Sequence, residues 1–196
     1  MRRFVTLFLP VLALIAAPLH AGVNSGVTDD GHFFSSQAIH QADDIIAQNR
    51  EHPHPDIRVV TVATIPDTKK NEFENQGKNA FFEHWADEIG KRDYVNGVVI
   101  LICKSPAHLQ VVQGNETRER AFVDADRREL VNNLVAAFRA KNYDDGLLEA
   151  VRFIRDRESA NLKGAHRARP PHVAGLPTTQ PTSQPAPPAT APTTRP

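Results

Sequence analysis

The chain has 196 residues, with 23 basic and 23 acidic side chains and a single cysteine. This length suits one domain plus an appendage, and one cysteine excludes an internal disulfide, so the core itself must stabilise the fold. Residues 22–158 carry 17 basic and 23 acidic side chains, whereas residues 159–196 carry four basic ones and no acidic one. An acidic domain with a small basic arm does not predict nucleic-acid binding.

Residues 1–21 have the order of a secretory signal peptide. Arg2 and Arg3 precede an apolar run from Phe4 to Ala17, and small residues end at Ala21. The run is shorter than the roughly 20 residues that a bilayer span requires. We therefore predict cleavage after Ala21, export to the periplasm or the medium, and no transmembrane anchor in the mature chain. An uncleaved anchor is the alternative.

The first half of the mature chain predicts a helix followed by a strand. A polar, turn-rich lead-in at 28–34 is followed by Ser35 or Ser36 as a helix cap. Apolar residues then recur at helical spacing: Ala38, Ile39, Ala42, Ile45 and Ile46. The loop that follows contains His52 and His54. Two histidines at this spacing could hold a metal, but a solvated proline-rich loop is the simpler interpretation.

Two apolar runs, residues 57–65 and 96–103, predict neighbouring strands. The second run, NGVVILIC, is typical of a central strand covered on both faces, although a buried helix is not excluded by periodicity. About 30 residues separate the runs, enough for a helical crossover, so the pair is expected to be parallel. That crossover is predicted to contain one helix with an aromatic stripe. Gly77 interrupts the stripe, and the helix is predicted to end at Gly90. Residues 108–114 follow after a short connection and predict an antiparallel hairpin partner, giving a small mixed sheet.

The remaining chain predicts an irregular stretch, two helices and a tail. Residues 114–122 are polar and irregular, and Asp126 with Glu129 predicts the cap of a third helix. A fourth helix is expected from a cap at Asp144 or Asp145 to about Glu158. From 159 to 196 the composition is rich in proline and threonine, which predicts an extended, solvated tail. This tail is interpreted as a spacer or as an arm that contacts anionic envelope polymers. Cys103 is interpreted as a buried apolar filler.

No phosphate-binding glycine loop, HExxH, GxSxG or cysteine pair occurs in the sequence. Acidic and amide side chains beside glycines remain, and such oxygen ligands suit Ca²⁺. The strand directions place Asn96 beside Gly114, with further acidic residues near the same edge of the sheet. Asp29 and Asp30 belong to this candidate site only if the lead-in crosses the sheet. The candidate metal ligands are Asp29, Asp30, Asn96, Glu116, Asp124 and Asp126. Helix capping by Asp124 and Asp126 and solvation of Glu116 are the alternatives.

The order of elements from about Thr28 to Arg157 resembles the TPM domain family. The marks are Trp85 some ten residues before Asn96-Gly97, the aliphatic run after that pair, and the YDDG step from Tyr143 to Gly146. The resemblance implies an α/β fold, a three-layer αβα sandwich on a short mixed sheet, in an exported protein. It also implies calcium binding or weak hydrolysis of phosphomonoesters, as in some members. This chain departs from the family pattern at Val95 and in the loop that begins at Gly114.

These features predict an exported TPM-type domain that binds calcium or acts as an adaptor in envelope or protein-complex maintenance. Its partner would be an unidentified envelope protein or complex. A weak metal-dependent phosphatase is the first alternative, in which a bound cation would polarise the phosphoryl group. A purely structural domain displayed on a spacer is the second. No nucleophile and no phosphate cradle can be recognised in the sequence, which favours a non-catalytic function.

Overall fold

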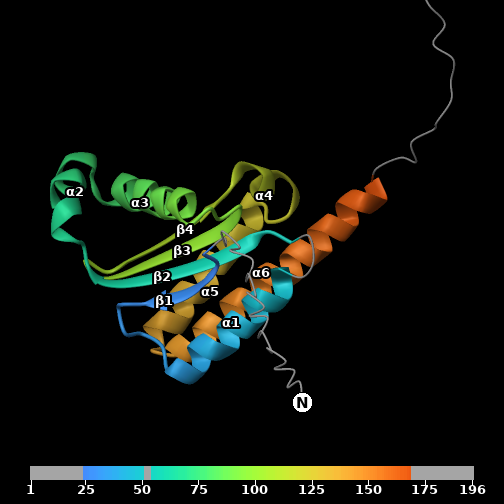
Figure 1. Ribbon diagram of the computed structural model, residues 1–196, viewed down its shortest axis with the longest axis horizontal. Helices are drawn as coiled ribbons and strands as arrows, with labels where there is room; N and C mark the ends of the chain where they lie inside the picture. Colours follow the sequence, from blue (N-terminus) through green and yellow to red (C-terminus); the bar gives the residue numbers. More distant parts are fainter. Residues whose placement is uncertain (1–23, 51–53, 169–196) are drawn as a thin grey trace, which may run out of the picture.

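A computed structural model describes residues 24–50 and 54–168. Its centre is one four-stranded sheet in the order β1-β2-β3-β4 (Figure 1). The strands are β1 (Gly26–Asp29), β2 (Asp56–Thr64), β3 (Gly97–Ser105) and β4 (His108–Gln113). β1, β2 and β3 run parallel, and β4 is antiparallel to β3. The predicted parallel pair and hairpin are therefore confirmed.

Helices cover both faces of the sheet, which confirms the three-layer αβα sandwich (Figure 1). One face carries α1 (Ser36–Arg50), α5 (Asp124–Arg139) and α6 (Tyr143–Ala168); the other carries α2 (Lys70–Gln76) and α3 (Lys78–Arg92). A short 3₁₀ turn, η1 (Asp67–Lys69), precedes α2, and α4 (Asn115–Arg120) lies at one edge of the sheet.

The central strand β3 divides the core into two halves. Its side chains alternate between the faces, as a strand requires. Val98, Ile100 and Ile102 pack with α1, α5 and α6, whereas Val99, Leu101 and Cys103 pack with α3. Burial raises the pKa of the Cys103 thiol, so this cysteine is an apolar core residue, as predicted.

The crossover between β2 and β3 contains two helices where the aromatic stripe predicted one. Gly77 separates α2 from α3 with φ of 77°, a backbone conformation that glycine adopts without steric cost. α3 does not stop at Gly90 but continues to Arg92. Its aromatic residues Phe81, Phe82 and Trp85 are buried against the sheet, so the stripe is core, as expected.

Two short elements lie in stretches for which the sequence predicted irregular structure. β1 overlaps the start of the lead-in and pairs with β2 from Gly26↔Arg58 to Asp29↔Thr61. The stretch after β4 contains α4. Both elements are short and exposed on one side, so neither has enough apolar residues to show a period.

The last helix continues ten residues past its predicted end, to Ala168. Asn161 explains part of this extension, because its Nδ2 donates to Ala121 O at 2.9 Å and to Asp126 Oδ2 at 2.8 Å. The predicted end of this helix near Glu158 is therefore wrong, and residues 159–168 are helical rather than extended. The predicted signal peptide at 1–21 and residues 169–196 lie outside the described residues. Within the described part of the chain, no helix is both long and apolar enough to cross a membrane.

Candidate functional site

The start of β2, the start of β3 and the end of β4 meet at one edge of the sheet, next to α4. Gly114 N donates to Gly97 O at 2.9 Å, which confirms that Asn96 and Gly114 are neighbours. The strands are very close here: a Cβ on Gly97 would lie 1.8 Å from Asp56 O. Only glycine fits at this position, and the Asn-Gly pair of the sequence is therefore a packing requirement as well as a turn signal.

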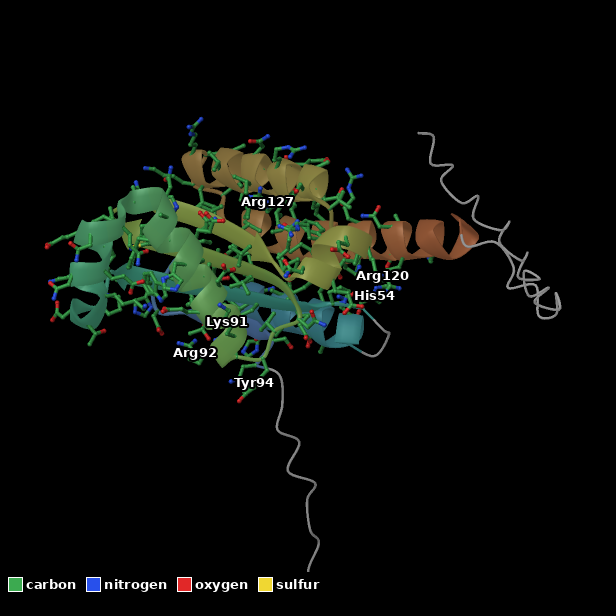
Figure 2. All side chains as sticks on the ribbon, turned by 90° about the horizontal axis from the view of Figure 1, so that it is seen from above. His54, Lys91, Arg92, Tyr94, Arg120 and Arg127 are labelled. Carbon is green, nitrogen blue, oxygen red and sulfur yellow. The ribbon has the colours of Figure 1, made fainter. Side chains whose placement is uncertain are left out.

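Two clefts flank this edge, and Asn96 lines both. The first, which we call the polar cleft, has a volume of about 350 Å³ and is lined by residues that include His54, Asp56, Glu116, Thr117 and Arg120. The second, the Tyr94 cleft, has a volume of about 520 Å³ and lies at the end of α3. Figure 2 shows His54 and Arg120 together at the first, and Lys91 and Tyr94 at the second.

The polar cleft holds the Asn96 backbone in place. Asp56 Oδ2 accepts a hydrogen bond from Asn96 N at 3.2 Å, and Thr117 Oγ1 donates to Asn96 O at 3.4 Å. Glu116 pairs with Arg120 at 3.1 Å, and both side chains are more than half exposed. Glu116 is therefore a solvated carboxylate that can exchange its arginine for another cation at little cost.

Asp124 and Asp126 support the start of α5. Asp124 accepts from Gln113 Nε2 at 3.1 Å, and it lines neither cleft. Asp126 is buried and lies in the first turn, where its carboxylate accepts from Val123 N at 3.1 Å. The helix begins at Asp124 and Val123 occupies the cap position, so the prediction of Asp126 as the cap residue is wrong by three positions. Its carboxylate nevertheless stabilises the helix start, as the capping alternative requires.

Asp29 and Asp30 lie at the opposite edge of the sheet from Asn96. Asp29 is the last residue of β1, and β1 starts at the same edge as β2 and β3. Its carboxylate accepts hydrogen bonds from Phe33 N at 3.1 Å and Phe34 N at 2.9 Å, so it shapes the turn into α1. The lead-in does not bring these two residues to the predicted site. Of the six candidate ligands, only Asn96 and Glu116 share a cleft.

A second group of possible metal ligands was missed because it joins two helices predicted as one. Glu72 on α2 and His84 and Glu88 on α3 offer ligand atoms within 4.8 Å of one another. His84 Nδ1 lies 2.7 Å from Glu72 Oε1. The ammonium group of Lys69 bonds to both glutamates. Lys69 therefore already supplies a positive charge to this group, and the group links α2 to α3.

The layers, the sheet order and the polar edge define a three-layer α/β domain with an open edge site. The family model of the TPM domain matches residues 27–157, and the chain belongs to this family. No curated protein matches the chain. The TPM resemblance of the sequence is thus confirmed.

One solved structure of low sequence identity shares this fold, and two others match the chain with lower scores. The N-terminal domain of a protein from P. gingivalis is 16% identical, with a TM-score of 0.55 over 70% of this chain and 83% of that one. The N-terminal domain of the cg2496 protein from Corynebacterium glutamicum is 18% identical, with a TM-score of 0.45 over 74% and 85%. The BA42 protein from Bizionia argentinensis is 16% identical, with a TM-score of 0.46 over 66% and 83%. At 16% identity, the likeness to the P. gingivalis domain concerns the fold alone.

Proposed function

We propose that this chain is an exported binding module of the TPM family, which binds Ca²⁺ weakly at the polar cleft and serves as an adaptor for an envelope protein or complex. One observation carries the proposal: Glu116 and Asn96, a carboxylate residue and an amide residue, line one solvent-open cleft. Oxygen atoms of this kind are the ligands of Ca²⁺, which tolerates irregular geometry and completes its shell with water. Export rests on the residue order of 1–21.

A non-catalytic role agrees with the burial of two candidate nucleophiles, the Thr117 hydroxyl in the cleft and the Cys103 thiol in the core. Thr117 is buried and its hydroxyl donates to Asn96 O, so this hydroxyl serves the fold. The thiol of Cys103 is buried under α3. Nucleophilic catalysis requires such a group to be exposed and to lie beside a base, and neither group meets that condition.

Calorimetric titration of the purified protein with Ca²⁺ tests the proposal. We expect a dissociation constant between about 1 μM and 1 mM, the span of exposed sensor and extracellular sites. Glu116→Gln should weaken binding at least about tenfold, because it removes the ligand charge. Glu119→Gln is the matched control, since Glu119 is exposed on the same helix and does not line the cleft. No heat with millimolar Ca²⁺, or equal loss in both variants, contradicts the proposal.

A phosphatase is the second candidate, favoured by the basic groups of the same cleft. Arg120 and His54 line it together with Glu116. A guanidinium group can bind phosphoryl oxygens, and a cation on Glu116 would neutralise the repulsion between carboxylate and phosphate. The turnover measurement that separates the two candidates is argued in the Discussion.

A further inference from the structure

One carboxyl group in the middle of α6 is shut off from solvent. Glu158 has an exposed fraction of 0%. Burial raises the pKa of Glu158 to about 8, because the ionised form would lose its hydration. At neutral pH the side chain is therefore a neutral carboxylic acid.

A hydrogen bond joins this acid to α1. Asn49, which is 3% exposed, donates from Nδ2 to Glu158 Oε2 at 3.0 Å. The second oxygen of each group, Asn49 Oδ1 and Glu158 Oε1, is buried and has no hydrogen-bond partner among the residues that the structure describes. Two buried oxygens without partners, on two groups already joined by one hydrogen bond, need an explanation.

A proton on Glu158 supplies it. We propose that neutral Glu158 and Asn49 form a cyclic acid–amide pair, and that this pair is a pH-sensitive latch. In the pair, Oε1–H of Glu158 donates to Asn49 Oδ1, and Asn49 Nδ2 donates to Glu158 Oε2. The ring gives each of the four polar atoms a partner. An ionised carboxylate only accepts hydrogen bonds, so it leaves Asn49 Oδ1 unpaired and the latch opens.

The latch reaches the wall of the polar cleft through the same amide. Asn49 Nδ2 also donates to Pro55 O at 3.1 Å, and Pro55 lines the cleft between His54 and Asp56. One side chain of α1 thus holds α6 and the start of β2 together. Ionisation of Glu158 removes half of the ring, and the Pro55 segment then loses its fixed anchor.

The charged groups around Glu158 do not stabilise its ionised form. Asp56 on β2 acts on it as a like charge and raises its pKa further, whereas the hydrogen bond from Asn49 of α1 lowers its pKa in part. The nearest arginines along α6, Arg155 and Arg157, bond to other carboxylates, on α6 and α5. On α4, Glu116 and Arg120 pair with each other. Among the residues that the structure describes, an ionised Glu158 therefore has no ion-pair partner.

The latch makes folding depend on pH in a defined direction. In the unfolded chain the carboxyl ionises near its ordinary pKa of 4.5, whereas in the folded chain it ionises near 8. This folded pKa is the raised one, so the stabilisation is complete below about 4.5 and is lost as pH rises to about 8. Across this window the unfolding equilibrium constant gains up to about tenfold per pH unit from this one group.

Glu158→Gln tests the latch, because a glutamine amide can form the same two hydrogen bonds at every pH. Denaturant unfolding of the purified protein and of the variant is measured from about pH 5 to about pH 9. The ratio of the unfolding constants, unmodified over variant, should rise by up to about tenfold per pH unit and level off near pH 8. Glu149→Gln, at an exposed position of α6, is the matched control and should show no such rise.

Two signals on the unmodified protein keep the proposal testable if the variant does not fold. The carbon-13 resonance of the Glu158 carboxyl should titrate with a midpoint near 8, and the amide resonance of Asp56 should follow it. A midpoint near 4.5, or a ratio of unfolding constants that stays level across the range, overturns the latch. An Asp56 amide that does not follow the titration overturns its link to the cleft.

Discussion

Arg58 of β2 donates from Nε to Asp93 Oδ2 at 2.9 Å and thereby joins the second strand to the end of α3. The two side chains are 12% and 5% exposed, so this ion pair is largely removed from water. Arg92 donates to the same carboxylate at 2.8 Å. The hydrogen bonds from Arg92 and Arg58 lower the pKa of Asp93. The pair fixes the segment that leads into Asn96, and with it the edge site.

Replacing Asp93 by alanine should destabilise the fold by about 3 kcal/mol, because Arg58 is left without its buried partner. The pKa of Asp93 is depressed in the folded state, so its stabilisation is present above about 3.8 and is lost as pH falls through the folded value. Urea unfolding at pH 7 and at about pH 3 measures both effects. The deficit of the variant should be smaller in acid.

Asp87→Ala is the matched control, since Asp87 is exposed on the same helix. We expect this change to alter stability by no more than about 0.5 kcal/mol. An Asp93 variant that loses no more stability than this control would show that the buried pair contributes nothing.

Gly97→Ala should destabilise the domain by about 3 kcal/mol, because the added methyl group meets the backbone of Asp56 at 1.8 Å and the strands must separate. Gly164→Ala should instead stabilise it by about 0.5–1 kcal/mol, since Gly164 lies within α6 and, beyond its own stretch of helix, no described atom is within 4 Å of the added carbon. Thermal unfolding of both variants provides the measurement. A Gly97 variant as stable as the unmodified protein would contradict the close strand contact.

Much of the fold could be predicted because its long elements have clear periods. The runs at 57–65 and 96–103 are mostly apolar, and residues on both faces of each strand belong to the core. β1 and α4 were missed because they are short, and the end of α6 is fixed by tertiary contacts of Asn161 that no local pattern contains.

Only those residues of the candidate site whose positions follow from strand direction were placed correctly from the sequence. Antiparallel pairing of β3 and β4 places Gly114 beside Asn96, as expected, but the position of Asp29 depended on an unrecognised strand. Glu158 carried a signal that could have been used. It continues the apolar stripe of Leu147, Val151 and Ile154 at helical spacing, which predicts a buried carboxyl.

The last prediction concerns phosphate esters: the purified protein should turn over an aryl phosphate far more slowly than about 1 per second, with or without Ca²⁺ or Mg²⁺. Fast phosphoryl transfer needs several positive groups or aligned amides around three oxygens and an attacking group held in line. The polar cleft offers Arg120, which is already paired with Glu116, and its Thr117 hydroxyl is buried. Brisk turnover with an added cation, abolished by a chelator and by Glu116→Gln but not by Glu119→Gln, would replace the binding module with the phosphatase.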